Sequence, residues 1–320
     1  MAITFLKRLL CPCGSALLVT LVASAACAGP KLFESQEVTP PGEYTFGIEG
    51  PAVDRDGSLF VVNFGKQGTI GKLAPGSASS EKYLDLPEGS VGNSIRFARD
   101  GTMFVADYKK HNIFQIKRGS LEPEVYFHAD DMSQPNDMTI ARDGTIYASD
   151  PNWKARSGRI WRIAKAADGS VQGQVMTAAR SMGTTNGIDL SPDEKTLYVS
   201  ESNSGQIWAY EVRGNELTSA RALKTFHADT VDGLRTDTAG RLLIARIQKG
   251  KIAVMQADGA LQREVDLQGR EPTNLAFGGA DGKTVFVTQR RGGFIEAFRT
   301  DHEGREHCLQ RPGCQGQATP

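Results

Sequence analysis

The stretch "NDMTIARDGTIYAS", residues 136–149, contains two apolar runs separated by Arg-Asp-Gly. An Asp-Gly pair between apolar runs is the strongest short signal for a β-hairpin. The stretch therefore predicts a strand, a tight turn at Gly144 and a second strand. Similar stretches elsewhere in the chain decide what these two strands belong to.

Five other stretches align with this one in their core. Each begins with a polar residue, called here the leading residue, and has a turn residue eight positions later. The leading residues are Glu49, Asn93, Asn136, Asn186, Asp232 and Asn274, and the turn residues are Gly57, Gly101, Gly144, Glu194, Gly240 and Gly282. Successive leading residues are 44, 43, 50, 46 and 42 residues apart. A repeat of this length is typical of the blades of a β-propeller.

A third apolar run follows each copy, and a more polar fourth run follows most of them. Four strands per repeat predict an all-β fold, a six-bladed β-propeller with four-stranded blades, over residues 29–300. The last copy lacks an outer strand after Phe298, so "KLFESQEVT" from Lys31 is expected to close the ring there. A long β-sandwich is the alternative fold, but it gives no reason for six similar periods.

The N-terminal residues 1–28 have the layout of a secretory signal peptide. Lys7 and Arg8 precede an apolar run, and the small residues Ala26-Cys27-Ala28 form an expected cleavage site. We therefore expect a periplasmic or secreted protein. The alternatives are an uncleaved membrane anchor and a lipoprotein attached at Cys27.

The tail, residues 301–320, holds Cys308 and Cys314, which we expect to pair in an oxidising compartment. The alternative is two free surface thiols. Lys plus Arg equals Asp plus Glu, at 37 each, so no basic excess indicates a nucleic-acid partner. With 39% hydrophobic residues the composition is that of a soluble globular protein, with no membrane span expected after signal cleavage.

The leading residues are expected to meet at the propeller axis, because the first strand of each blade lines the central channel. Two are acids and four are primary amides, and all six offer oxygen. Oxygen donors converging on one axis describe a calcium-type site, and two carboxylates balance one divalent cation. The alternative is that each polar residue caps a turn. That alternative does not explain why six of them stand at one fixed offset.

Four motifs resemble the metal-site motifs of the senescence marker protein, gluconolactonase and luciferin-regenerating enzyme family. They are, in order, Glu49-Gly50-Pro51, Pro135-Asn136-Asp137, Thr185-Asn186-Gly187 and Val231-Asp232-Gly233. The resemblance spans about Glu43 to Arg299. It implies a six-bladed propeller with Ca²⁺ in the tunnel, or another divalent cation such as Mg²⁺, Mn²⁺ or Zn²⁺.

The same resemblance implies roles for the individual residues. The direct metal ligands would be Glu49, Asn186 and Asp232. Asn136 would be a fourth ligand or would orient the substrate, with Asp137 beside it as a substrate contact. Asn93 and Asn274 have no counterpart with a firm role, and we expect them to line the channel or to support the ligands.

The function implied is metal-dependent hydrolysis of a lactone or related small ester, with Asp232 as the base that activates water. Animal gluconolactonases carry an arginine two residues before the asparagine that matches Asn136, where this chain has Ser133 or Gln134 depending on how the loop is aligned. The resemblance is therefore closer to the bacterial lactonase-like branch. The alternatives are a non-catalytic propeller that binds a partner around a structural ion, and other chemistry on the same fold, such as phosphotriester hydrolysis or condensation of the strictosidine synthase kind.

The longest insertion, residues 150–174, is where substrate contacts are expected. Trp153, Lys154 and Arg156 are the side chains proposed for them. A solvated loop is the alternative interpretation of this segment.

Overall fold

The computed structural model describes residues 31–178, 180–227, 229–311 and 313–314. The predicted signal peptide, residues 1–28, and with it Cys27, lie outside the described residues. Over the described ranges, no helix is long and apolar enough to span a bilayer.

The described strands form six sheets, each built mainly from consecutive antiparallel strands. The first blade contains β2 (Tyr44–Val53), β3 (Leu59–Phe64), β4 (Thr69–Leu73) and β5 (Glu81–Asp85). The second contains β6 (Gly92–Phe97), β7 (Met103–Asp107), β8 (Asn112–Ile116) and β9 (Glu124–His128). The third contains β10 (Met138–Ile140), β11 (Ile146–Asn152), β12 (Ser157–Lys165) and β13 (Val171–Val175).

The remaining three blades follow the same plan, with one added strand in the fourth blade and an N-terminal strand in the sixth. The fourth contains β15 (Thr185–Leu190), β16 (Thr196–Glu201), β17 (Gln206–Arg213) and β18 (Glu216–Thr225), and β14 (Thr177–Ala178) adds a fifth strand parallel to β18. The fifth contains β19 (Val231–Thr236), β20 (Leu242–Arg246), β21 (Lys251–Met255) and β22 (Leu261–Asp266). The sixth contains β23 (Pro272–Gly278), β24 (Thr284–Gln289), β25 (Phe294–Arg299) and the N-terminal β1 (Gln36–Glu37).

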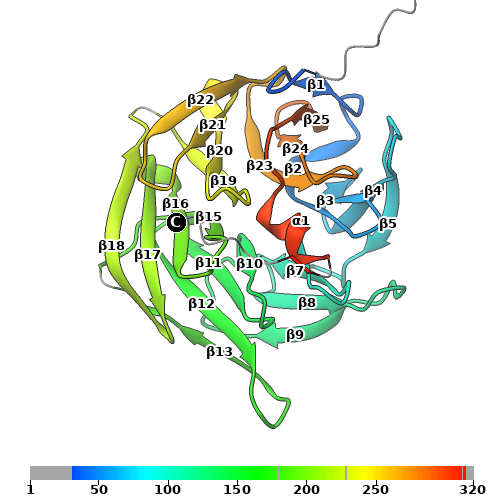
Figure 1. Cartoon of the computed structure of the whole chain (residues 1–320). Helices are drawn as coiled ribbons and strands as arrows, with labels where there is room; N and C mark the ends of the chain where they lie inside the picture. The colour runs from blue at the N-terminus through cyan, green and yellow to red at the C-terminus, as the bar shows by residue number, and fades with distance from the viewer. Residues whose placement is uncertain (1–30, 179, 228, 312, 315–320) are drawn as a thin grey trace, which may run out of the picture. The chain divides into compact units, whose positions relative to one another are not determined.

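The sheets are arranged in a ring with the first strand of each blade toward the centre (Figure 1). The predicted closure of this ring is confirmed, because β1 pairs antiparallel with β25 through Gln36–Ala297 and Glu37–Glu296. The N-terminal segment thus supplies the outer strand that the last repeat lacks. A six-bladed β-propeller is the observed fold, as the repeat predicted.

The hydrophobic core lies between neighbouring blades and is divided into six clusters. One cluster, for example, joins Phe60 of the first blade to Ile95 and Val105 of the second. Another joins Ile48 and Val61 to Ile295 of the last blade, and so closes the ring. Because each blade buries one face against each neighbour, no blade has a complete core of its own.

Each predicted turn lies between the first two strands of its blade. The six turn residues all have positive φ, from 61° at Glu194 to 90° at Gly101. Each donates its backbone N–H to the residue three positions earlier, as Gly57 does to Asp54 at 3.1 Å. Glycine adopts this conformation without a steric penalty, and Glu194 is the one non-glycine among the six.

The first strands carry a bulge at the leading residue in five blades. In β15, for example, the register with β16 shifts between Thr185 and Ile188, around Asn186. The third blade has a related arrangement, because Ser149 bonds the backbones of both Asn136 and Asp137. A bulge re-aims a side chain that regular alternation would bury in the sheet. It therefore turns the leading residues toward the axis.

Glycines beside three leading residues let the inner strands approach one another. A Cβ at Gly187 would lie 2.5 Å from the carbonyl oxygen of Asp232 in the next blade. A Cβ at Gly233 would lie 2.2 Å from Oδ1 of Asn274, again in the next blade. These distances are shorter than any ordinary contact, so only glycine fits at either position.

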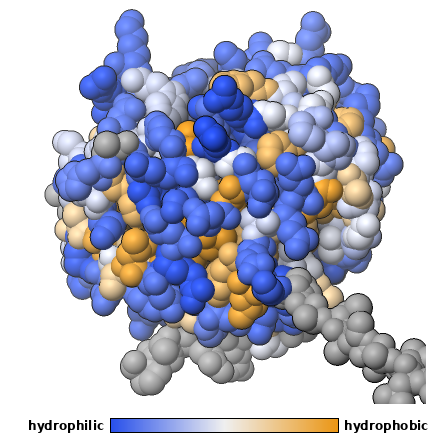
Figure 2. Space-filling view, turned by 90° about the horizontal axis from the view of Figure 1, so that it is seen from above, coloured by the Kyte–Doolittle hydropathy of each residue, from blue (hydrophilic) through white to orange (hydrophobic). Residues whose placement is uncertain are grey.

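After β25 the chain crosses to the centre of the ring, where α1 (Arg305–Leu309) lies (Figure 1). Cys308 in α1 is joined to Cys314 by a disulfide, with Cα atoms 5.5 Å apart. The face seen in Figure 2 is mostly hydrophilic, with patches of apolar side chains between the polar ones.

Gly187→Ala is expected to destabilise the protein by about 1–3 kcal/mol, because the new methyl group overlaps the backbone of the adjacent blade. Gly47→Ala is the matched control, since its Cβ would meet nothing closer than 3.4 Å. Urea unfolding of the two variants measures the difference. Equal stability of the two variants would contradict the close approach of the inner strands.

Candidate active site

Five of the six leading residues border one pocket of about 250 Å³: Glu49, Asn93, Asn136, Asn186 and Asp232. The sixth, Asn274, is buried, and its Nδ2 donates to Oε2 of Glu49 at 3.1 Å. Residues separated by up to 225 positions in the chain thus meet at one place. The convergence at the axis that the repeat predicted is present in the structure.

Hydrogen bonds within the protein orient these side chains. The backbone N–H of Gly50 donates to Oε2 of Glu49 at 2.8 Å. The amide nitrogen of Asn186 donates to Oγ of Ser202 at 2.9 Å. Because that nitrogen is used inside the protein, the amide oxygen of Asn186 is the atom left for a ligand.

The two carboxyl groups of the pocket are in an unfavourable electrostatic setting. Burial raises the pKa of Glu49 to about 7, and the negative charge of Asp137 adds to the effect. Burial also raises the pKa of Asp232 well above its ordinary value, followed by repulsion from Glu49. Arg290 partly offsets the shift at Asp232, but among the described residues neither carboxylate has an ion-pair partner.

This donor set fits a divalent cation of the oxygen-seeking kind. Two carboxylates and neighbouring amide oxygens are the ligands that Ca²⁺ takes, and a cation would remove the repulsion between the acids. In the part of the chain that the structure describes, no three His, Cys, Asp or Glu side chains cluster as a metal site. Any cation here therefore depends on the asparagines as well as on the two acids.

Asp137, expected beside the substrate, lies elsewhere. Its side chain is fully buried and does not border the pocket. Its Oδ1 accepts from Nη2 of Arg96 at 2.5 Å, and its Oδ2 accepts from Nη1 of Arg235 at 2.9 Å. Asp137 follows Asn136 directly, and adjacent residues in extended backbone point in opposite directions. Its carboxylate therefore binds the two arginines and leaves the pocket to Asn136.

Sequence reasoning missed the layer of charges beneath the pocket. Three charged residues and one threonine of this layer stand three positions after a leading residue: Arg96, Thr139, Asp189 and Arg235. Thr139 donates to Asp189 at 2.7 Å, and both are buried. The sequence did contain a signal for this layer, namely polar and charged residues at one fixed offset in otherwise apolar strands. Aligned positions of the repeat meet at the same depth of the channel, so these residues could have been expected to contact one another.

The C-terminal segment complements this layer of charges. Arg305 of α1 is buried and lies 3.2 Å from Asp189. Glu306 lies 3.7 Å from Arg96 and 3.8 Å from Arg235. The helix therefore places one charge of each sign against partners of opposite sign on the inner strands.

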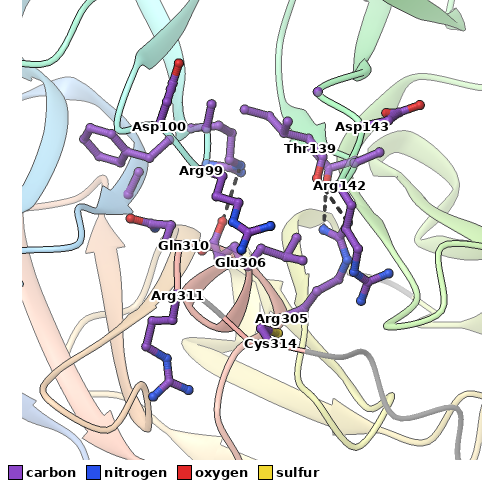
Figure 3. A pocket seen from close by; sticks show the side chains of 18 of the residues that line it. Arg99, Asp100, Thr139, Arg142, Asp143, Arg305, Glu306, Gln310, Arg311 and Cys314 are labelled. Carbon is purple, nitrogen blue, oxygen red and sulfur yellow. Dashed lines mark hydrogen bonds and ion pairs between the residues drawn. The ribbon is translucent and has the colours of Figure 1, made fainter.

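A second cavity, of about 290 Å³, lies between α1 and the turns of the second and third blades (Figure 3). Arg305 and Glu306 are among its lining residues, and the dashed lines in the figure show them engaged with neighbouring groups. None of the leading residues borders this cavity. The chemistry expected of the repeat therefore belongs to the smaller pocket.

The mouth of the smaller pocket includes residues that the repeat did not indicate. Phe46, Tyr108, Ile247 and Arg290 line it together with Trp153. The expected contribution of the insertion is thus limited to Trp153, which precedes β12. Lys154 and Arg156 are exposed and are not among the lining residues.

The raised pKa of Glu49 predicts a pH dependence of stability in the absence of divalent cations. The pKa of Glu49 in the folded protein is about 7, above the ordinary 4.5, so the folded state binds the proton of Glu49 more tightly than the unfolded state does. This difference stabilises the fold fully below pH 4.5, and the stabilisation is lost as the pH rises through 7. The loss is on the order of 3 kcal/mol, since each pKa unit is about 1.4 kcal/mol. Thermal unfolding in the presence of a chelator at several pH values should show that the Tm of Glu49→Gln depends less on pH than the Tm of the wild type does. The exposed Glu88→Gln should behave like the wild type, and equal slopes for all three proteins would refute the assignment.

Curated proteins with known names are similar to part of this chain. A 6-deoxy-6-sulfogluconolactonase of Pseudomonas putida is 29% identical over 146 residues, which cover 43% of this chain and 48% of that protein. The chain spans about half the length of the curated relatives it matches.

Solved structures share the fold at low identity. A gluconolactonase from Xanthomonas campestris superimposes with a TM-score of 0.69 at 21% identity, covering 83% of this chain and 89% of that one. A calcium-binding protein, regucalcin, from Agrobacterium tumefaciens gives 0.67 at 19% identity, covering 84% and 97%. The family described as SMP-30/Gluconolactonase/LRE-like region matches residues 46–291, so the chain belongs to this family.

Proposed function

We propose that the protein is a divalent-cation-dependent hydrolase of lactones or related small esters. The observation that carries the proposal is the pair of uncompensated carboxylates, Glu49 and Asp232, beside amide oxygens in one pocket. The similarity to relatives named as lactonases supports the reaction class.

The cation would be held by Glu49, Asn186 and Asp232, with Asn136 as a fourth ligand. Ca²⁺ suits this set best, because all four residues offer oxygen and none offers the nitrogen or sulfur that Zn²⁺ prefers. The name of the neighbour regucalcin, a calcium-binding protein, agrees with this choice. When bound, such a cation supplies Lewis-acid polarisation of an ester carbonyl.

The two acids are suited to different tasks. Oε2 of Glu49 already accepts from Gly50 and Asn274, which holds its carboxylate in one orientation as a ligand. Asp232 borders the same pocket, and its carboxylate is the group we assign to accept a proton from water.

In the proposed reaction, water forms a bond to the carbonyl carbon and gives its proton to Asp232. The bond between that carbon and the ring oxygen then breaks, and the ring oxygen takes the proton from Asp232. The product is the open hydroxy acid. Asn93 and Asn136 border the same pocket and provide hydrogen bonds that orient the substrate.

We also propose that the protein is exported to the periplasm or secreted. The layout of residues 1–28 and the disulfide between Cys308 and Cys314 support this location, because disulfides persist in oxidising compartments.

Hydrolysis of a lactone panel should be lost on chelation and should return with Ca²⁺. Asp232→Asn should lower kcat by about 10²–10⁴, the usual contribution of a general base. Glu49→Gln should in addition lose the increase in Tm that Ca²⁺ gives the wild type. The exposed Asp130→Asn is the control and should keep both properties.

Two results would overturn parts of the proposal. Full turnover by Asp232→Asn would remove the assignment of the base. An increase in Tm with Ca²⁺, without turnover of any lactone, would favour a structural ion in a propeller that only binds partners.

A further inference from the structure

We propose that the preferred substrate carries a planar apolar substituent, such as an aryl ring, on the lactone or ester, rather than several hydroxyl groups. This inference rests on the proposed hydrolysis of lactones and concerns the mouth of the same pocket. It goes beyond the comparisons, because the relatives and the neighbour named as lactonases are named for sugar lactones.

Uncovered aromatic rings at the pocket mouth are the first observation. Phe46 is 67% exposed and Trp153 is 40% exposed. Among the described residues these are the only exposed Phe, Tyr or Trp side chains, and both border this pocket. Leaving such rings in water forfeits their burial free energy, so their placement together indicates a surface meant to be covered by a ligand.

Neighbouring residues extend the apolar surface. Tyr108, Ile48 and Ile247 also line the pocket, and the two isoleucines are buried. The rings come from separate blades, with Phe46 in β2, Tyr108 directly after β7, and Trp153 directly after β11. A flat apolar group entering the pocket would therefore meet rings from three blades.

Four neutral polar side chains of the pocket make hydrogen bonds within the protein: Asn63, Ser202, Thr230 and Thr273. Asn63 donates through Nδ2 to the carbonyl of Gly47 at 2.6 Å and accepts at Oδ1 from Gly68 at 3.1 Å. Oγ1 of Thr230 accepts from Gln248 at 2.7 Å.

Two further hydroxyl groups of the lining have partners as well. Oγ1 of Thr273 donates to the carbonyl of Ile48 at 3.1 Å. Oγ of Ser202 accepts from Asn186 at 2.9 Å. A polyhydroxylated substrate needs free donors and acceptors, because buried hydroxyl groups without partners cost affinity. Each of these four side chains already has at least one partner within the protein.

Arg290, the cation of the pocket lining, is also engaged. Its Nε lies 3.0 Å from Oε2 of Glu271, and its guanidinium lies over the ring of Phe46, 4.7 Å from the centroid. The pairing with Glu271 offsets part of the charge, and the stacked guanidinium contacts the Phe46 ring. The arginine thus supports one of the aromatic rings of the lining.

Three lactones test the inference: γ-phenyl-γ-butyrolactone, unsubstituted γ-butyrolactone and glucono-1,5-lactone. We expect kcat/KM for the phenyl compound to exceed that for the unsubstituted ring by about tenfold or more, as a ring filling an apolar pocket gives. In Phe46→Ala and Trp153→Ala this ratio should fall by about fivefold. Leu121→Ala is the matched control, because Leu121 is 58% exposed and lies outside the pocket, and its ratio should not change.

A binding measurement separates this inference from the proposed function. Calorimetry would compare 5-phenyl-2-pyrrolidinone with 2-pyrrolidinone, two lactams that take the place of the lactones. One outcome is that no lactone is hydrolysed, but the phenyl lactam binds more tightly than 2-pyrrolidinone and this gain is lost in Phe46→Ala and Trp153→Ala. That outcome would refute the proposed hydrolase activity and support the aromatic binding site. Preference for the sugar lactone, or a phenyl group that gives no gain in rate or binding, overturns the inference while lactone hydrolysis can still hold.

Discussion

The carboxylate of Asp137 holds together residues from four blades at the axis of the ring. It belongs to the third blade, and it binds Arg96 of the second and Arg235 of the fifth. Asn274 of the sixth blade donates to it at 3.3 Å. A buried carboxylate without such partners is costly, so this cluster is stable only when the ring is closed. The charge at the axis therefore favours the closed ring with this register of inner strands over open or slipped arrangements.

The same cluster explains why the pocket above it is left with unbalanced charge. Beneath the pocket, three guanidinium groups face three carboxyl groups: Arg96, Arg235 and Arg305 against Asp137, Asp189 and Glu306. Asn274 connects this balanced layer to Glu49. Glu49 and Asp232 have no equivalent partners, since Arg290 is engaged with Glu271. The protein thus neutralises its structural charges internally, and the excess negative charge is confined to the place where a cation would bind.

Much of the fold could be predicted from the sequence, because each blade repeats the same local signals. The turn position held even at Glu194, where no glycine marks it, since the offset of eight residues is fixed by strand length. The meeting of the leading residues followed from the same offset. The bulges could not be predicted from the sequence, because they form where the first strands of neighbouring blades come close to one another at the axis. Asp137 was misplaced for another reason: it follows Asn136 directly in extended backbone, so the two side chains point in opposite directions and only Asn136 borders the pocket. The short β14 also gave no signal, because two residues carry no periodicity.

The mouth of the pocket was the least predictable part, and it is also where substrate choice is made. The axis residues come from strands whose positions the ring fixes, so a shared site is expected across a family with this fold. Phe46 lies near the start of β2, and Trp153 lies in the turn between β11 and β12, where closure of the ring sets no residue type. Much of the surface of both rings stays in water, apart from the contact of Phe46 with Arg290. A ligand in the pocket would cover that surface, which is why the mouth, rather than the axis, carries the information about what this protein binds.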